Sequence, residues 1–307
     1  MKIILANPRG FCAGVDRAIN IVEKTIEKYG APVYVKNEIV HNKAVVNSLR
    51  DLGALFVKEV SDVPDGAVII FSAHGAAISA YEEAKNKKLT ILDATCPLVE
   101  KVHYNIKKYS RDGAKIILIG HKGHPEVEGH LGQIEEEIYL ITKSEDIALL
   151  PFDKDEKLAY ITQTTLSRME SESIIAELKN RFPDILGPSK GDLCYATTNR
   201  QTAIEQLAEK IDLLLVVGSA NSSNSNRLKE LGEAVGIKSY LIDEPQKIEI
   251  SWFEGCQNIG ITSGASAPEY LVQELVKNIC EKFKIEKVEE THATEEKVKF
   301  PMPPDLG

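Results

Sequence analysis

Three stretches of the chain place apolar residues at the spacing of a helix directly after a cysteine. The cysteines are Cys12, Cys96 and Cys194, and each follows a strand-like apolar run. The apolar positions behind them are Val15, Ile19, Val22 and Ile26; Val99, Val102 and Ile106; and Ile204, Leu207 and Ile211. This spacing predicts an amphipathic helix after each cysteine. Each thiol is therefore expected at a helix N-terminus, where unpaired N–H groups and the helix dipole stabilise a thiolate.

Strand-like runs follow each predicted helix in the same order, which indicates a repeat. Val33, in the first run, lies 21 residues after Cys12, and the corresponding runs begin 19 residues after Cys96 and Cys194. The three runs of each repeat are 32–35, 54–57 and 68–71; 115–119, 137–141 and 158–161; and 213–217, 239–242 and 258–261. Strands that alternate with helices predict parallel sheets with covered faces. A period of about 95 residues predicts three copies of one α/β unit.

The repeat predicts the domain boundaries. These are an N-terminal strand plus the first α/β unit at 1–97, the second unit at 98–193, the third at 194–285 and a charged C-terminal tail at 286–307. A run at 89–93 leads to Cys96, and a weaker one at 190–193 leads to Cys194. The N-terminal run 2–6 would complete the third unit if the units close in a ring. We therefore predict three similar α/β units with mostly parallel sheets around a pseudo-threefold axis, with the cysteines facing a central cleft.

Polar side chains gather where the predicted strands end. The loops after the first strands carry His41; then His121, His124 and Glu126; then Ser222, Ser223 and Asn224, while those after the third strands carry His74, Thr164 and Ser266. Such donors suit phosphate oxygens, and Glu126 among them is placed to carry a proton. Singly, the hydroxyl residues could be helix N-caps, and the H-x-x-H of His121 and His124 is a weak zinc signal. Recurrence at six strand ends favours a binding site.

Five further residues stand outside this pattern. His103, His130 and His292 are interpreted as structural or surface residues. Cys256 and Cys280 break the repeat, so we interpret them as packing residues.

Composition and charge argue against several classes of protein. No apolar run approaches the roughly 20 residues that span a bilayer, and the N-terminal apolar stretch is too short for a signal peptide. Five cysteines, an odd number, argue against a disulfide framework and for a cytoplasmic protein that uses some thiols for metal binding or catalysis. The net charge of −9 argues against broad electrostatic binding to nucleic acid.

Three thiolates without a fourth equivalent cysteine leave two kinds of metal site open. A zinc ion could take three cysteines and a histidine or water. A cubane iron–sulfur cluster could take three cysteines and leave one iron open, to bind substrate as a Lewis acid while the cluster stores electrons. The sequence has no G-x-G-x-x-G or Walker A motif, so electrons would come from a separate carrier protein.

The chain resembles the 4-hydroxy-3-methylbut-2-enyl diphosphate reductase family over nearly its whole length. The matching motifs are residues 7–15, 72–75, 93–97, 120–126, 162–167, 194–200, 218–226 and 262–268. The resemblance implies three α/β domains with one [4Fe–4S] cluster at the centre, held by Cys12, Cys96 and Cys194 and leaving one iron open. It also implies that an allylic diphosphate loses its hydroxyl reductively, giving isopentenyl and dimethylallyl diphosphate.

The same resemblance implies roles for the polar residues. The diphosphate would be bound by His41, His74, His124, Ser222, Ser223, Asn224 and Ser266. Glu126 would supply protons, with Thr164 and His124 in the relay and in contact with the substrate. The implied electron donor is a flavodoxin or ferredoxin with its reductase. Two alternatives stay open: a metal-dependent hydro-lyase, which needs no reductant, and a redox-sensing iron–sulfur protein, which needs no phosphate donors.

Overall fold

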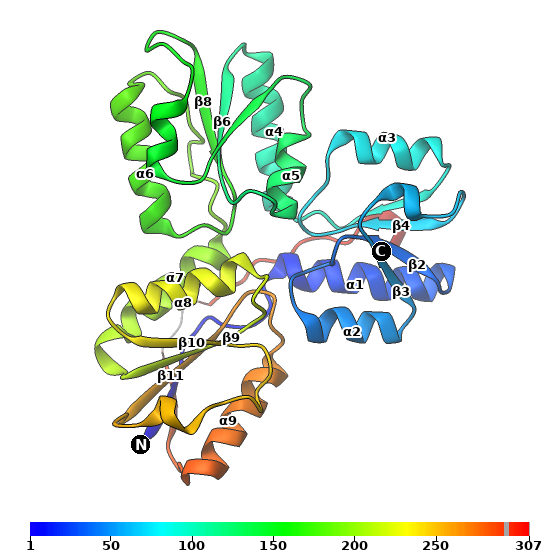
Figure 1. Ribbon diagram of the computed structural model, residues 1–307. Coiled ribbons are helices and arrows are strands. Elements are labelled where there is room, and N and C mark those ends of the chain that lie inside the picture. The colour runs from blue at the N-terminus through cyan, green and yellow to red at the C-terminus, as the bar shows by residue number, and fades with distance from the viewer. Residues whose placement is uncertain (292–294, 307) are drawn as a thin grey trace. The chain divides into compact units, whose positions relative to one another are not determined.

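The chain folds into helices packed on three parallel sheets. The computed structural model describes residues 1–291 and 295–306 (Figure 1). By internal packing the chain divides into two compact units. Unit 1 comprises Met1–Asp16, His41–Asn47 and Tyr195–Lys299, and unit 2 comprises Arg17–Val40, Ser48–Cys194 and Phe300–Gly307. Within the described residues, no helix is long and apolar enough to cross a membrane.

Unit 1 contains a five-stranded sheet in which strands from early and late parts of the sequence are neighbours. Its order is β10 (Lys238–Ile242), β9 (Leu213–Val217), β11 (Asn258–Ser263), β1 (Lys2–Leu5) and β12 (Val288–Glu290). All its strand pairs are parallel, and Ile3 of β1 stands opposite Ile259 of β11. The expectation that the N-terminal run completes the third sheet is thereby confirmed.

Helices cover both faces of this sheet, which explains the unbroken apolar sequence of β9. Leu213, Leu215 and Val217 pack in one core with α9 (Glu269–Phe283). Leu214 and Val216 alternate into a second core with α7 (Tyr195–Leu207) and α8 (Ser223–Ala234). Continuous apolar strands are typical of parallel sheets buried on both sides.

Unit 2 contains the other two sheets. The first has the order β3 (Ala54–Val57), β2 (Val33–Lys36), β4 (Val68–Phe71) and β5 (Thr90–Asp93), and the second has the order β7 (Ile138–Ile141), β6 (Lys115–Ile119) and β8 (Leu158–Thr162). Every pair is parallel, as expected. The helices between these strands are α2 (Lys43–Asp51), α3 (Ile78–Asn86), α5 (Pro125–Leu131) and α6 (Arg168–Arg181). Short 3₁₀ helices lie at Val60–Asp62, Ser144–Leu149, Ala208–Lys210, Ile250–Phe253 and Pro304–Leu306.

The three predicted helices begin at the cysteines. They are α1 (Ala13–Tyr29), α4 (Pro97–Arg111) and α7, and Pro97 occupies the first turn of α4. Gly30 and Gly113 follow α1 and α4 with φ of 78° at each, a left-handed conformation that glycine adopts without strain. The start of each helix therefore fixes the backbone beside a cysteine.

The prediction of a strand at 190–193, before Cys194, is wrong. This segment is a turn and bend in which Gly191 has a φ of 68°. Asp192 replaces the missing strand contacts, since its carboxylate accepts a hydrogen bond from the Thr162 N–H at 3.2 Å at the end of β8. The segment before Cys194 is thus held by a side-chain hydrogen bond, whereas the sequence predicted the backbone hydrogen bonds of a strand.

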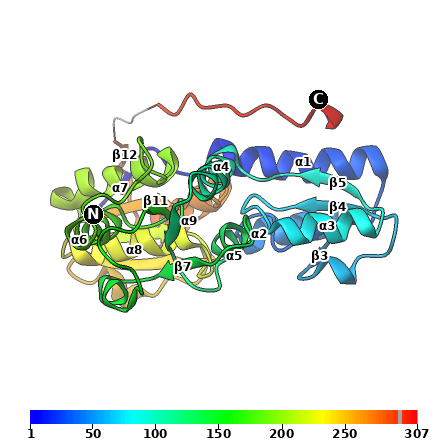
Figure 2. The same cartoon turned by 90° about the horizontal axis from the view of Figure 1, so that it is seen from above.

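The C-terminal residues are more ordered than their charged composition indicates. Val288–Glu290 add β12 to the edge of the sheet beside β1. In unit 2, the segment from Phe300 runs beside α1 and ends in the 3₁₀ helix Pro304–Leu306 (Figure 2). Arg17, Lys24 and Lys28 of α1 donate to the backbone carbonyls of Pro301, Leu306 and Asp305, at 2.8, 3.3 and 2.6 Å.

Candidate active site

The loop that carries Cys12 is held on both sides within unit 1. The Gly10 N–H donates to Ser263 Oγ at 2.7 Å, and the Gly10 carbonyl accepts from the fully buried Arg200 at 2.7 Å. The Cys12 N–H donates to the Ala265 carbonyl at 3.2 Å. These bonds tie the thiol-bearing loop to the end of β11 and to α7.

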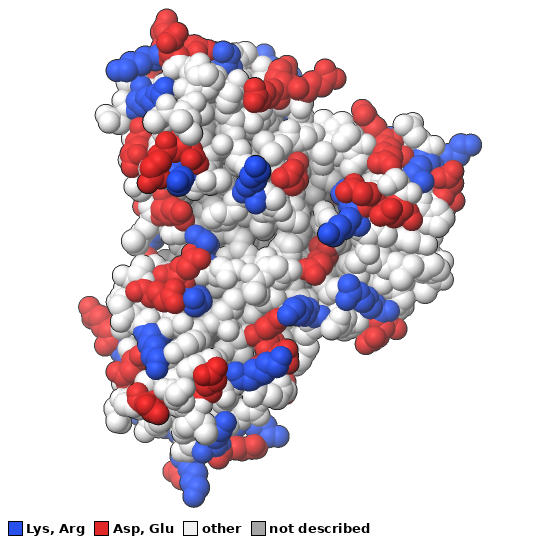
Figure 3. Space-filling model, in the orientation of Figure 1, with Lys and Arg blue, Asp and Glu red and all other residues white. Residues whose placement is uncertain are grey.

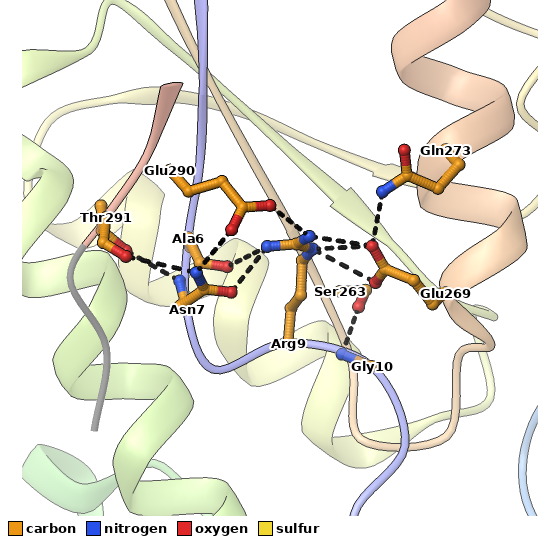
Figure 4. Close-up of polar contacts among 9 residues, drawn as sticks. All are labelled: Ala6, Asn7, Arg9, Gly10, Ser263, Glu269, Gln273, Glu290 and Thr291. Carbon is orange, nitrogen blue, oxygen red and sulfur yellow. Dashed lines mark hydrogen bonds and ion pairs between the residues drawn. The ribbon is translucent and has the colours of Figure 1, made fainter. Parts of the chain in front are cut away.

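Arg9 fixes the same loop through carboxylates from distant parts of the sequence (Figure 4). Its guanidinium lies 2.9 Å from Glu269 at the start of α9 and 2.9 Å from Glu290 at the end of β12. It also donates to Asn7 Oδ1 at 2.6 Å. Because the planar guanidinium is shared among these acceptors, it holds the turn before Cys12 in one geometry.

The other two cysteines belong to unit 2. Cys96 is the N-cap residue of α4, and its N–H donates to the Ala73 carbonyl at 3.0 Å. The Cys194 N–H donates to the Thr164 carbonyl at 3.1 Å. Both backbones are therefore fixed to the loops that follow β4 and β8, which carry His74 and Thr164.

None of the five cysteines, all within the described part of the chain, forms a disulfide. Cys12, Cys96, Cys194 and Cys280 are half-buried, and Cys256 is buried. Burial raises the pKa of Cys256 and of Cys280, which disfavours their thiolates. In each unit, the described residues include no group of three or more His, Cys, Asp or Glu side chains gathered to hold a metal ion. The donor set itself suits an iron–sulfur cluster, because cysteine thiolates hold such clusters.

Glu126 is a buried carboxylate held by Thr164. It is 2% exposed, in the first turn of α5. The Thr164 N–H donates to Oε1 at 2.6 Å, and the Thr164 hydroxyl donates to Oε2 at 3.1 Å. Burial alone would raise the pKa of Glu126, but His130, His124 and the Thr164 N–H hold that pKa below its usual value. The structure thus brings together the sequence-predicted proton donor and its predicted partner.

One predicted histidine, His124, lies beside Glu126, and a second, His74, packs against His124. His124 is the N-cap of α5, where its Nδ1 accepts from the Glu126 N–H at 3.1 Å. The His74 and His124 rings meet edge to face, with centroids 5.7 Å apart. Ser72 Oγ lies 3.2 Å from His74 Nδ1 and fixes that ring. Unit 2 therefore gathers His74, His124, Glu126 and Thr164 into one cluster.

A histidine set aside in the sequence analysis also reaches Glu126. His130 is fully buried, and its Nε2 lies 3.4 Å from Glu126 Oε1. The sequence signal was the spacing, since residues i and i+4 share one face of a helix. His103 of α4 packs against His130 with ring centroids 5.1 Å apart. His292 lies outside the described residues.

The remaining predicted binding residues meet in unit 1. Ser222 is the N-cap of α8, and its Oγ lies 3.4 Å from Ser266 Oγ. Ser266 Oγ donates to the His41 carbonyl at 3.0 Å, and Asn221 Nδ2 lies 3.5 Å from His41 Nδ1. Ser223 is the first residue of α8. His41, Ser222, Ser223 and Ser266 thus come from three segments to one helix start.

Asn224 gives this cluster an unsatisfied polar group. It is 5% exposed, and neither its amide nitrogen nor its amide oxygen has a hydrogen-bond partner in the described part of the chain. A buried amide without partners destabilises a fold unless a ligand or water satisfies it. The neighbouring Gly264 has no room for a side chain, since a Cβ there would approach Ser225 Oγ to 2.0 Å. Asn224 at the start of α8 is therefore suited to an anionic ligand.

Comparison with known proteins identifies the family of the chain. A sequence model of the family described as LytB protein matches residues 3–280. The chain is 57% identical to the 4-hydroxy-3-methylbut-2-enyl diphosphate reductase of Haemophilus influenzae (strain 86-028NP), over 100% of this chain and 98% of that protein. The protein of that name from Acidithiobacillus ferrooxidans (strain ATCC 53993 / BNL-5-31) is 54% identical, over 99% and 96%.

A solved structure gives the same result. The E-1-hydroxy-2-methyl-but-2-enyl-4-diphosphate reductase from Plasmodium falciparum matches with a TM-score of 0.96 at 38% identity, over 100% of this chain and 96% of that one. Sequence and fold therefore both match over the whole length of the chain. The chain belongs to the LytB family of 4-hydroxy-3-methylbut-2-enyl diphosphate reductases.

Proposed function

We propose that the chain reductively removes the hydroxyl group of 4-hydroxy-3-methylbut-2-enyl diphosphate, giving isopentenyl diphosphate and dimethylallyl diphosphate. The substrate takes up two electrons and two protons, its C–O bond breaks, and the hydroxyl leaves as water. As a member of its family the chain is an oxidoreductase. The observation that supports the proposal is the double contact between Glu126 and Thr164, because it fixes a buried carboxyl group of the kind that can pass a proton to a leaving hydroxyl.

We propose that Cys12, Cys96 and Cys194 hold one [4Fe–4S] cluster and leave one iron open. Bound there, the cluster supplies electrons and a Lewis-acidic iron for the substrate hydroxyl. Support comes from their half-buried thiols at helix starts and from the backbone bonds that fix each cysteine. Cys256 and Cys280 take no part in this proposal.

The diphosphate is bound by local donors in our proposal. These are His41, Ser222, Ser223, Asn224 and Ser266 of unit 1 and His74, His124 and Thr164 of unit 2. On the face drawn in Figure 3, acidic and basic side chains are interspersed, and the chain as a whole has a net charge of −9. An anionic ligand therefore depends on hydroxyl, amide, imidazole and backbone N–H groups at close range. The unpartnered amide of Asn224 supports this assignment.

Glu126, Thr164 and His124 form the proposed proton path. Hydroxide is a poor leaving group, so the departing oxygen needs a proton as the C–O bond breaks. Glu126 gives that proton, and the Thr164 hydroxyl keeps the carboxyl oriented. His124 fixes the first turn of α5, because its ring accepts from the Glu126 N–H. In this proposal Thr164 and His124 position the Glu126 carboxyl group that gives its proton to the departing oxygen.

Electrons are proposed to come from a flavodoxin or ferredoxin with its own reductase. Support comes from the absence of nucleotide-binding motifs in the sequence, which leaves no bound nicotinamide to provide them. Thiolate ligands and a reducible cluster also suit the reducing cytoplasm, where we propose that the enzyme works.

Anaerobic turnover of the cluster-loaded protein tests the function. With reduced flavodoxin and the allylic diphosphate, both isoprenoid diphosphates should form, and without reductant neither should. A product formed without reductant would favour the hydro-lyase instead. Failure to bind the diphosphate, in a protein that holds iron and sulfide, would favour the redox sensor. The Cys256→Ser variant serves as a control that keeps its cluster.

A further inference from the structure

Glu126 also has His130 beside it, and His103 packs on His130; the reaction above uses neither histidine. His130 Nε2 lies 3.4 Å from Glu126 Oε1, and both His130 ring nitrogens are buried without a hydrogen-bond partner in the described part of the chain. His103 packs edge to face on the His130 ring, and its Nε2 is likewise buried without a partner there. Buried ring nitrogens of this kind are positions where bridging water is expected.

His103 connects this pair to a cavity in unit 2. The cavity has a volume of about 420 Å³, and its polar lining includes Tyr81, Asp93, His103, Tyr104, Lys107 and Gln133. Tyr104 is 61% exposed, so the cavity opens to solvent beside His103. Gly75 borders the ring on another side, since a Cβ there would approach His103 Cε1 to 2.7 Å. Glu126, His130, His103 and the cavity therefore follow one another from the interior to solvent.

We propose that His130 and His103 are positioning residues that return a proton from this cavity to Glu126 after each proton transfer. This proposal rests on the proposed role of Glu126 as proton donor. Once Glu126 has given up a proton, its carboxylate takes the His130 Nε2–H while His130 Nδ1 takes a proton that His103 and water relay from the cavity, so the His130 ring stays neutral. The ring then exchanges its Nδ1 proton for one on Nε2 through water and returns to its first tautomer. One proton enters from solvent for each proton that leaves Glu126, and no electron moves along this path.

Burial explains why such a path is needed. Glu126 is 2% exposed, so it has almost no direct contact with solvent. The pKa of Glu126 lies below its usual value despite burial, chiefly because His130 stands beside it. The carboxyl group is therefore ionised between turnovers and must take up a proton before the next one. Burial and the nearby His130 lower the pKa of His103 to about 3. A neutral His103 accepts a proton on one nitrogen as it releases one from the other.

The charged groups around the two histidines come from several segments. Glu126 on α5 and Asp192 interact with His130, and Lys107 on α4 interacts with His103. Lys85, Asp93 and Glu100 line the cavity with His103. Asp192 is itself anchored by the Thr162 N–H, and burial raises its pKa. Glu126 is thus the carboxylate in direct range of His130 Nε2.

The test compares His130→Gln and His103→Ala with the wild type as cluster-loaded holoenzymes at saturating reductant. Both variants should lose about 10- to 100-fold in kcat, keep KM within twofold, and show a larger solvent deuterium isotope effect. Free imidazole should restore His103→Ala, because the truncated side chain opens onto the cavity. Tyr104→Phe, in the same cavity, should keep wild-type kcat and isotope effect.

Several outcomes would overturn the proton path. The first is that both histidine variants show the kcat and the isotope effect of the wild type. The second is that imidazole does not restore the kcat of His103→Ala when the variant and the wild type are compared at the same imidazole concentration. If His130→Gln does not fold, His103→Ala carries the test by itself. A wild type that fails to reduce the diphosphate rejects the proposed function. An inactive Glu126→Gln beside fully active histidine variants rejects only the path.

Discussion

Glu126 and Thr164 are joined by two hydrogen bonds from a single residue, one from the backbone N–H at 2.6 Å and one from the hydroxyl at 3.1 Å. The N–H bond fixes the position of the carboxyl, since it depends only on the backbone after β8. The hydroxyl bond depends on the side chain and can be removed separately. The same Thr164 carbonyl accepts from the Cys194 N–H, so one residue holds both the acid and a proposed cluster ligand.

Glu126→Gln should lower kcat by at least about 100-fold, because the amide keeps the shape of the side chain but cannot deliver a proton. KM should change little. Thr164→Val should have a smaller effect, since the 2.6 Å backbone bond remains. Steady-state kinetics with reduced flavodoxin measure both. Turnover of Glu126→Gln near the wild-type rate would refute the proton role.

Asn224→Ala should weaken binding of the diphosphate without lowering the stability of the fold. The buried amide has no partner in the described protein, so its removal should leave the free energy of unfolding unchanged or raise it. The loss of a donor to a charged ligand should raise KM by about tenfold or more. Thermal melts and substrate titrations check the two parts. A protein that melts lower and binds the diphosphate normally would show that Asn224 has a structural role.

His103 should make the fold less stable in mild acid. Burial, His130 and Lys107 lower its pKa in the folded protein to about 3, whereas an unfolded histidine has a pKa of about 6.5. Between these values the unfolded chain binds a proton that the folded chain does not, so stability falls as the pH falls. From pH 7 to pH 5 this amounts to about 2 kcal/mol.

His103→Gln should remove that part of the pH dependence. Urea unfolding followed by circular dichroism at pH 7 and pH 5 gives the difference for each protein, with Tyr104→Phe as the control on the same helix. Equal differences in His103→Gln and the wild type would contradict the lowered pKa.

Replacement of the cysteines should divide them into two groups. Cys12→Ser, Cys96→Ser and Cys194→Ser should each lose most bound iron and sulfide, because three ligands already leave one iron without a protein donor. Cys256→Ser and Cys280→Ser should keep wild-type iron content. Anaerobic iron and sulfide analysis checks this, and the opposite distribution would reject the ligand assignment.

The end of the chain should stabilise unit 2. Leu306 is 8% exposed beside α1, so Leu306→Ala should lower the free energy of unfolding by about 1–3 kcal/mol. Asp305→Ala is the matched control, because Lys28 binds the Asp305 backbone carbonyl and the side chain is not needed. Equal melting temperatures for the two variants would show that burial of Leu306 contributes nothing.

Much of the fold could be predicted because its strands are covered on both faces. Runs such as Leu213–Val217 are apolar throughout, and their repeat fixes the order of strands and helices. The conformation of the segment before Cys194 could not be predicted, because a hydrogen bond to the Asp192 side chain holds it and not the backbone hydrogen bonds of a strand. Strand β12 has a charged sequence, and it forms because it pairs with β1 and because Glu289 meets Lys2.

The candidate site was predictable where a motif carries the side chain. Glu126, Thr164 and His124 follow strand ends, and the structure joins them. His130 was not assigned to the site, because its contact with Glu126 depends on the short helix α5 beginning at Pro125. The packing of His103 on His130 depends on how α4 and α5 meet, which no local pattern shows.

The position of β1 between β11 and β12 constrains the order of events during synthesis. In the described residues β1 pairs with β11 and β12, which follow it by more than 250 residues, so this sheet is completed only after β12 has been made. The turn bearing Cys12 is anchored by Ser263, Ala265 and Glu290, so it cannot be organised on the nascent chain. The proposed cluster should therefore be loaded only after the chain has been made at least as far as Glu290.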